Sequence, residues 1–204
     1  MIQRIGHDNM PDDEFVSLLE DQLSKLGYNE AIQLCWTNHP TVTGATFVGT
    51  LWKTYLGNYA VLTGVNYFGD NVVRRKVNGV WQPTEWFNPP MQLGVEYRTT
   101  ERYFGKPVYV KVVDCGVMPN ATSKDVDANI SNAQQVISVN GTTNDKRIIP
   151  SFQFGWGKLS TPLNDVIALD AGILSEKVFI HIATSIDRSH YTAIAVLKYT
   201  KTTD

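Results

Sequence analysis

Alternation of apolar and polar side chains is the dominant pattern in this chain, and it predicts strands. In the stretch 108–113, valines at every second position alternate with Tyr109 and Lys111, and Gly105 and Pro107 place a turn before them. The stretch 191–200 repeats the period of two, with Thr, Ile, Val and Lys on one face and Ala, Ala, Leu and Tyr on the other. A period of two is the pattern of a half-buried strand. Both segments are therefore expected to be strands with one buried face.

The N-terminal half contains the clearest hairpin. Residues 71–77 and 80–86 have strand composition, and Asn78-Gly79 separates them. Asn-Gly tolerates the positive φ angles that a two-residue turn demands. The stretches 46–52 and 59–65 are two further strands by composition.

One short helix is expected near the N-terminus. Acidic residues at 12–14 suit the exposed N–H groups of a helix start. Val16, Leu19, Leu23 and Leu26 follow at helical spacing, flanked by Phe15 and Leu18, and Gly27 is the expected C-cap. The stripe covers about two heptads, too few for a self-sufficient coiled coil. Two interpretations stay open: a helix packed on its own β domain, or a helix that gathers protomers around a threefold axis.

Composition supports a β-rich fold and excludes several functions. The net charge is −2 with no basic run, so nucleic-acid binding is not expected. No apolar run approaches the roughly 18 residues that span a bilayer, and the N-terminus lacks the apolar core of a signal peptide. Cys35 and Cys115 are expected to be reduced, structural thiols.

Catalytic chemistry has no signature here. Four histidines lack metal-ligand spacing, and there is no nucleophile elbow, P-loop or dinucleotide-binding motif. A glycosidase needs only two carboxylates, and the C-terminal half offers Asp165, Asp170, Glu176 and Asp187. We expect no catalytic residue, no metal and no cofactor.

Four ordered blocks resemble the head or tip domains of bacteriophage tail fibres and receptor-binding proteins. They are Gly105–Val112, Met118–Thr122, Asn129–Asn132 and Asp187–Asp204, which correspond to a family pattern of the form "dGKPvYrKv … lPnnt … nIsn … dRs.ytA.v.leYTKttd". Together they are spread over about half of the chain. Two positions depart from the pattern: Val110 stands where the family has Arg, and His190 where it has a small residue.

This resemblance implies a non-enzymatic protein of the virion tail. It would attach the phage to a host cell-surface carbohydrate, assemble as a homotrimer with other tail or baseplate proteins, and be made in the host cytoplasm without membrane insertion. Two alternatives remain: a structural adaptor of the tail or baseplate, and a small carbohydrate-cleaving enzyme.

The same family context suggests the domain organisation. The stretch 31–90, ending in RRKVNGVWQPTEW, resembles pyocin-knob-like modules of phage and bacteriocin fibres. Asn88-Pro89-Pro90 then breaks secondary structure. The expected fold is mainly β, with a helical segment at 1–30, a small knob-like β domain at 31–90 and a C-terminal β-sandwich head at 91–204. Strands of the head are expected at 95–98, 108–113, 134–139, 148–154, 165–169, 178–183 and 191–199.

A ligand site is expected at the turn before the last strand. Saccharide recognition needs an aromatic face and planar hydrogen-bonding groups. Asp187, Arg188 and His190 concentrate such groups, and Trp156 between two glycines is a candidate stacking face. The alternatives are a plain solvated turn and a core tryptophan for which the glycines make room. Trp81 and Trp86 are expected to be core residues.

Overall fold

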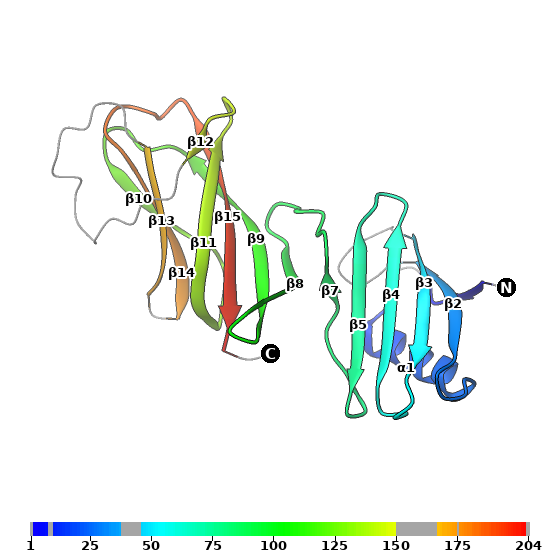
Figure 1. The fold of residues 1–204 in the computed structure, drawn as a ribbon. Coiled ribbons are helices and arrows are strands. Elements are labelled where there is room, and N and C mark those ends of the chain that lie inside the picture. Colours follow the sequence, from blue (N-terminus) through cyan, green and yellow to red (C-terminus); the bar gives the residue numbers. More distant parts are fainter. Residues whose placement is uncertain (1, 8–9, 38–45, 150–166, 175, 203–204) are drawn as a thin grey trace. The chain divides into compact units, whose positions relative to one another are not determined.

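A computed structural model describes residues 2–7, 10–37, 46–149, 167–174 and 176–202, and Figure 1 traces the chain. Over these residues the fold is mainly β with one short helix, as predicted. The chain divides into two compact units, Met1–Pro90 with Arg98–Thr100, and Met91–Tyr97 with Glu101–Asp204.

The first unit is a sheet covered on one face by helix α1 (Asp12–Ser24). The sheet order is β1-β2-β3-β4-β5-β7, with β6 paired to β5. Only β1 with β2 is a parallel pair among these strands. The strands are β1 (Gln3–Ile5), β2 (Ala31–Thr37), β3 (Thr46–Lys53), β4 (Ala60–Asn66), β5 (Asn71–Val77), β6 (Val80–Trp81) and β7 (Glu85–Trp86).

Helix α1 uses its apolar stripe within its own unit. Phe15, Leu19 and Leu23 are fully buried, whereas Val16 and Leu26 are only half-buried. The ring of Phe15 lies 6.1 Å from that of Trp36 on β2. Of the two interpretations of the helix, these contacts favour packing on its own β domain.

The end of α1 differs from the prediction. The helix stops at Ser24 with Lys25 as its C-cap, so Gly27 does not cap it. Lys53 of β3 instead donates from Nζ to the carbonyl oxygens of Leu23 (3.0 Å) and Leu26 (2.7 Å). A cation at a helix C-terminus satisfies free carbonyls and opposes the negative end of the helix dipole. Because that cation comes from a distant strand, the local sequence could not reveal it.

Trp36 occupies the centre of the core of the first unit. Its ring stacks on Phe47 at 5.7 Å, and Phe47 contacts Trp86 edge-on at 6.2 Å. Gly64 of β4 makes room for it, since a Cβ there would lie 2.3 Å from Cη2 of Trp36.

The predicted hairpin forms at Asn78-Gly79, but its second strand is interrupted. Val77 faces Val80 and Lys76 faces Trp81, whereas Val73 faces Glu85 and Val72 faces Trp86. Three residues, 82–84, thus stand opposite two, and Pro83 among them has no N–H to donate. This extra residue is a β-bulge, and it turns Trp86 into the core and Glu85 to the other face of the sheet.

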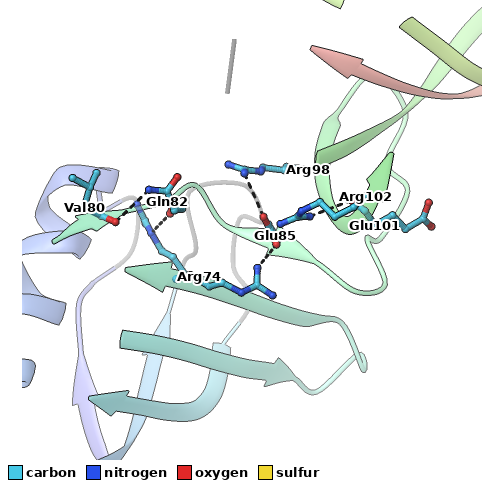
Figure 2. A network of polar contacts seen from close by, with 8 residues as sticks. Arg74, Val80, Gln82, Glu85, Arg98, Glu101 and Arg102 are labelled. Atoms are coloured by element: carbon cyan, nitrogen blue, oxygen red, sulfur yellow. Dashed lines mark hydrogen bonds and ion pairs between the residues drawn. The ribbon is translucent and has the colours of Figure 1, made fainter. Parts of the chain in front are cut away.

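Glu85 is a buried acid that lies on this other face. It is 3% exposed and forms ion pairs with Arg75 and with Arg98, whose Nη2 lies 3.3 Å from its Oε1. Figure 2 shows the Arg98 contact, together with Arg74 donating to the carbonyl of Gln82. On the helix side of the sheet, Arg74 pairs with both carboxylate oxygens of Asp12 at 2.6 and 2.8 Å. The strand β5 is therefore anchored by charge on both faces.

The second unit is an antiparallel β-sandwich. One sheet has the order β9-β15-β11-β12 and the other β10-β14-β13. Residues of both sheets, among them Val139, Leu169, Ile180 and Leu197, form one buried core. The strands are β9 (Lys106–Val117), β10 (Ser123–Asp127), β11 (Ala133–Thr143), β12 (Ile148–Ile149), β13 (Ile167–Leu174), β14 (Lys177–Thr184) and β15 (Thr192–Lys201). The strand β8 (Glu96–Tyr103) precedes them, and its residues Arg98–Thr100 belong to the first unit.

The last strand confirms its predicted faces, whereas β9 does not. Ala193, Ala195, Leu197 and Tyr199 of β15 are buried. On β9 the valines 108, 110 and 112 are buried, but Lys111 and Val113 are buried too. That second face points to the other sheet, where Lys111 Nζ donates to the carbonyl of Asn129 at 2.9 Å. The strand β10, of sequence SKDVD, was not predicted because its side chains show no apolar alternation.

Candidate functional site

The turn before β15 is joined to the loop that follows β9. Asp187 forms a β-bridge with Asn120, and the backbone N–H of Arg188 donates to the carbonyl of Pro119 at 3.1 Å. The N–H of Tyr191 then donates back to the carbonyl of Arg188 at 2.9 Å and closes the turn. Two loops that are far apart in sequence thus fix the backbone of the predicted site.

The carboxylate of Asp187 is used inside the turn. Its Oδ1 accepts hydrogen bonds from the backbone N–H of Ser189 (2.9 Å) and from Ser189 Oγ (2.7 Å). These bonds lower the pKa of Asp187 below its ordinary value, because they stabilise the charged form. A lowered carboxyl pKa contributes stability above the unfolded-state pKa, and that contribution is lost as the pH falls through the folded-state value. The turn is therefore expected to hold at neutral pH and to loosen in acid.

Arg188 and His190 meet at the ring of Tyr191. The Arg188 guanidinium carbon lies 5.8 Å from the centre of that ring and the His190 ring 4.0 Å from it. Arg188 is 7% exposed, whereas His190 is exposed. Arg147, from the loop before β12, lies 5.9 Å from the same ring. The site thus combines one aromatic ring with two guanidinium groups and an imidazole.

The four predicted site residues have different outcomes in the structure. It brings Arg188 and His190 together, and it directs the Asp187 carboxylate to Ser189. Trp156 lies outside the described residues. Sequence reasoning missed Tyr191 and Arg147. Tyr191 could have been found as the residue next to His190, but nothing in the sequence links Arg147 to the turn.

Two concave surfaces were also not predicted. A polar groove of about 410 Å³ lies in the second unit, and its lining includes Asp127, Asn129, Asn132, Glu176 and Lys177. An open hollow of about 510 Å³ lies on the first unit, and its lining includes Val48, Thr50, Thr63, Val65 and Phe87. The asparagines of the polar groove belong to the third of the four sequence blocks.

Two of the carboxylates considered for sugar cleavage, Glu176 and Asp187, lie too far apart to act as a pair. Glu176 precedes the first residue of β14 and Asp187 follows its last by three. A strand of that length spans roughly 25 Å. The carboxyl groups of glycosidases lie about 5–9.5 Å apart. Asp170 pairs with His181 in mid-strand, and Asp165 lies outside the described residues.

Among the described residues, no group of three or more His, Cys, Asp or Glu side chains is placed to hold a metal ion. In the same part of the chain, no helix is both long and apolar enough to cross a membrane.

The four sequence blocks of the C-terminal half converge in the sandwich. The first block lies in β9 and pairs with the last strand, as with Val112 and Val196. The second block bonds to the turn at Asp187 and Arg188. The third block is bonded to the fourth, because the backbone N–H of Thr202 donates a hydrogen bond to the carbonyl of Asn132 at 2.8 Å. Stretches dispersed over 100 residues therefore form one hydrogen-bonded structure.

The fold and these surfaces define a mainly β, two-unit protein with a β-sandwich as its second unit. No family model and no curated protein matches the chain. Among solved structures it is similar to pyocin fibres. The R1 pyocin fibre of P. aeruginosa aligns at 10% identity over 83% of this chain, with a TM-score of 0.24. An N-truncated R2-type pyocin tail fibre aligns at 9% identity over 85% of this chain and 92% of its own, with a TM-score of 0.27.

The R2 pyocin fibre of P. aeruginosa aligns at 8% identity over 85% of this chain, with a TM-score of 0.25. This chain spans 63% of the R1 fibre and 63% of this R2 fibre. TM-scores this low do not establish a shared overall fold.

Proposed function

We propose that this protein is a tail-fibre or receptor-binding protein that attaches a phage or phage-like tail to bacterial surface saccharide. The observation that carries the proposal is the convergence of the four sequence blocks. If the resemblance were accidental, the blocks would have no reason to meet in the folded chain. Instead they are joined by strand pairing and hydrogen bonds into one sandwich.

The remaining parts of the proposal follow from the same family. The first unit is then a knob-like module, the protein assembles as a homotrimer with other tail or baseplate proteins, and its place is the virion tail. Saccharide is bound and not cleaved, in keeping with the distance between Glu176 and Asp187.

Binding to whole bacterial cells tests the proposal. Labelled protein is mixed with a panel of strains, and with the same cells after periodate oxidation of their surface saccharides. We expect binding to some strains, its loss after oxidation, and no release of reducing sugar. Failure to bind any strain would favour the structural adaptor, and released sugar would favour the enzyme.

His190 allows a clean test of the predicted turn, because it is exposed whereas Arg188 is buried. Replacing Arg188 also removes packing against Tyr191, so a loss of binding in that variant would be ambiguous. If the turn contacts the saccharide, His190→Ala is expected to weaken cell binding roughly ten- to a hundredfold, the cost of a desolvated hydrogen bond. The control is His7→Ala, another exposed histidine that pairs with Glu14 in the first unit. Equal binding by both variants would exclude the turn as the contact site.

A further inference from the structure

Phe104 stands at the tip of the β8–β9 hairpin with its ring in solvent. It is 90% exposed, more than any other large apolar side chain in the described part of the protein. Phe104 and Gly105 form a two-residue connection between Tyr103 and Lys106, with φ angles of 48° and 79°. Positive φ at both positions is the requirement of a type I′ hairpin turn.

The same chain uses a favoured residue pair at its other hairpin. Asn78 and Gly79 have φ angles of 51° and 84°, nearly the same backbone. Asn adopts positive φ readily, whereas a bulky residue such as Phe is strained there. Phe104 is thus unfavourable for the fold twice, through its backbone and through its exposed ring. Residues held in strained backbone conformations cluster at sites where a protein binds a ligand.

The surroundings of Phe104 are polar. The ring of Tyr103 meets it edge-on at 4.7 Å, and Tyr103 Oη accepts a hydrogen bond from Gln135 Nε2 at 3.4 Å. Lys106 Nζ donates to Gln134 Oε1. An aromatic face therefore lies at the tip of a hairpin that carries an ammonium group, and the amide groups of β11 contact the same hairpin.

This combination matches a sugar ring better than a protein surface. A pyranose has an apolar face of C–H groups and hydroxyls around its edge, which suit an aromatic ring beside planar amides. A stable protein interface buries about 800 Å² on each partner, far more than one side chain offers. We propose that Phe104 is a stacking platform for a sugar ring of the bacterial surface saccharide, with Gln134, Gln135 and Lys106 as hydrogen-bonding neighbours. The inference rests on the proposed function and assigns it a site away from the turn at Asp187.

Phe104→Asn separates a binding role from a structural one. It restores the Asn-Gly pair, so the melting temperature is expected to rise by about 2–4 °C. Loss of the ring is expected to weaken binding roughly ten- to a hundredfold. If Phe104 were needed only for folding, the same replacement would lower the melting temperature and leave binding by the folded protein unchanged. Phe104→Trp keeps an aromatic face and is expected to retain binding.

The probe is a strain that binds the unaltered protein, together with polysaccharide extracted from it. Phe68→Asn is the matched control, since Phe68 is another turn phenylalanine, 69% exposed, in the first unit. Light scattering of each variant reports the oligomeric state. Weak binding by Phe104→Asn alone, at unchanged mass, supports the proposal.

Three results would overturn it. Full binding by Phe104→Asn would remove the site but leave the proposed function standing. A lower mass for Phe104→Asn would make the tip a contact between subunits. If the unaltered protein binds no strain, the proposed function fails and the site fails with it.

Discussion

At the scale of single residues, close contacts decide which side chains this fold accepts. Gly64 leaves the space that Trp36 fills, and a methyl group there would lie 2.3 Å from the indole. Burial also changes chemistry, since desolvation raises the pKa of the Cys115 thiol to about 11. Both cysteines are free thiols.

The two thiols are therefore expected to react differently. With a pKa near 11, roughly one Cys115 in a thousand is a thiolate at pH 8, and only the thiolate is alkylated efficiently. Cys35 is only half-buried on β2. Iodoacetamide at pH 8 should label Cys35 and leave Cys115 unmodified, as located by peptide mass spectrometry. Labelling in urea provides the control and should modify both residues. A linked pair, or early labelling of Cys115, would contradict the structure.

At the scale of elements, charge and register fix what the hydrophobic pattern leaves open. The bulge at 82–84 decides which of Glu85 and Trp86 enters the core, because one extra residue reverses the faces of the strand. Glu85 then lies on the opposite face with two arginines. Trp81 is half-buried, and its indole N–H donates to Glu20 of α1 at 2.7 Å. Of the two tryptophans of the hairpin, Trp86 is the one in the core.

Replacing Glu85 is expected to destabilise the first unit strongly. Glu85→Ala would remove the buried carboxylate that pairs with Arg75 and with Arg98, whose side chain is 10% exposed. Breaking a buried ion pair from one side costs about 3–5 kcal/mol of unfolding free energy. Urea unfolding followed by tryptophan fluorescence measures this, since Trp36, Trp52, Trp81 and Trp86 all lie in the first unit.

The matched control for Glu85 is Lys25→Ala. Lys25 pairs with Asp21 at 2.6 Å, but both side chains are more than half exposed. Such a pair contributes only about 0–0.5 kcal/mol. Similar losses in the two variants would show that the Glu85 network does not stabilise the sheet.

At the scale of the whole molecule, the apolar surfaces left outside the core bear on assembly. The apolar stripe of α1 is buried in its own unit, so its central residues are not available to gather protomers. The outer face of the first sheet instead exposes Val48, Trp52 and Val65. The proposed trimer is therefore expected to form mainly through its β units.

Light scattering tests this assembly directly. At micromolar concentration the full chain should have three times its mass of 22.8 kDa. Val65→Lys places a charge on the exposed sheet face and should lower that mass if the face is a subunit contact. Thr192→Lys, which places a charge at an exposed position of β15 in the second unit, is the control and should leave the mass unchanged. A monomer at this concentration would contradict the trimer itself.

The sequence by itself determined the features that local chemistry controls. Alternation specified the faces of β15, Asn-Gly specified the turn at 78–79, and acidic residues specified the start of α1, because each depends on neighbours along the chain. Only the tertiary structure decided features that depend on distant partners. Lys53 ends the helix in place of Gly27, Arg188 is buried against Tyr191, and the polar strand β10 forms because β14 supplies its hydrogen bonds. Such contacts produce no periodic pattern in the sequence, because the two partners meet only in the folded structure.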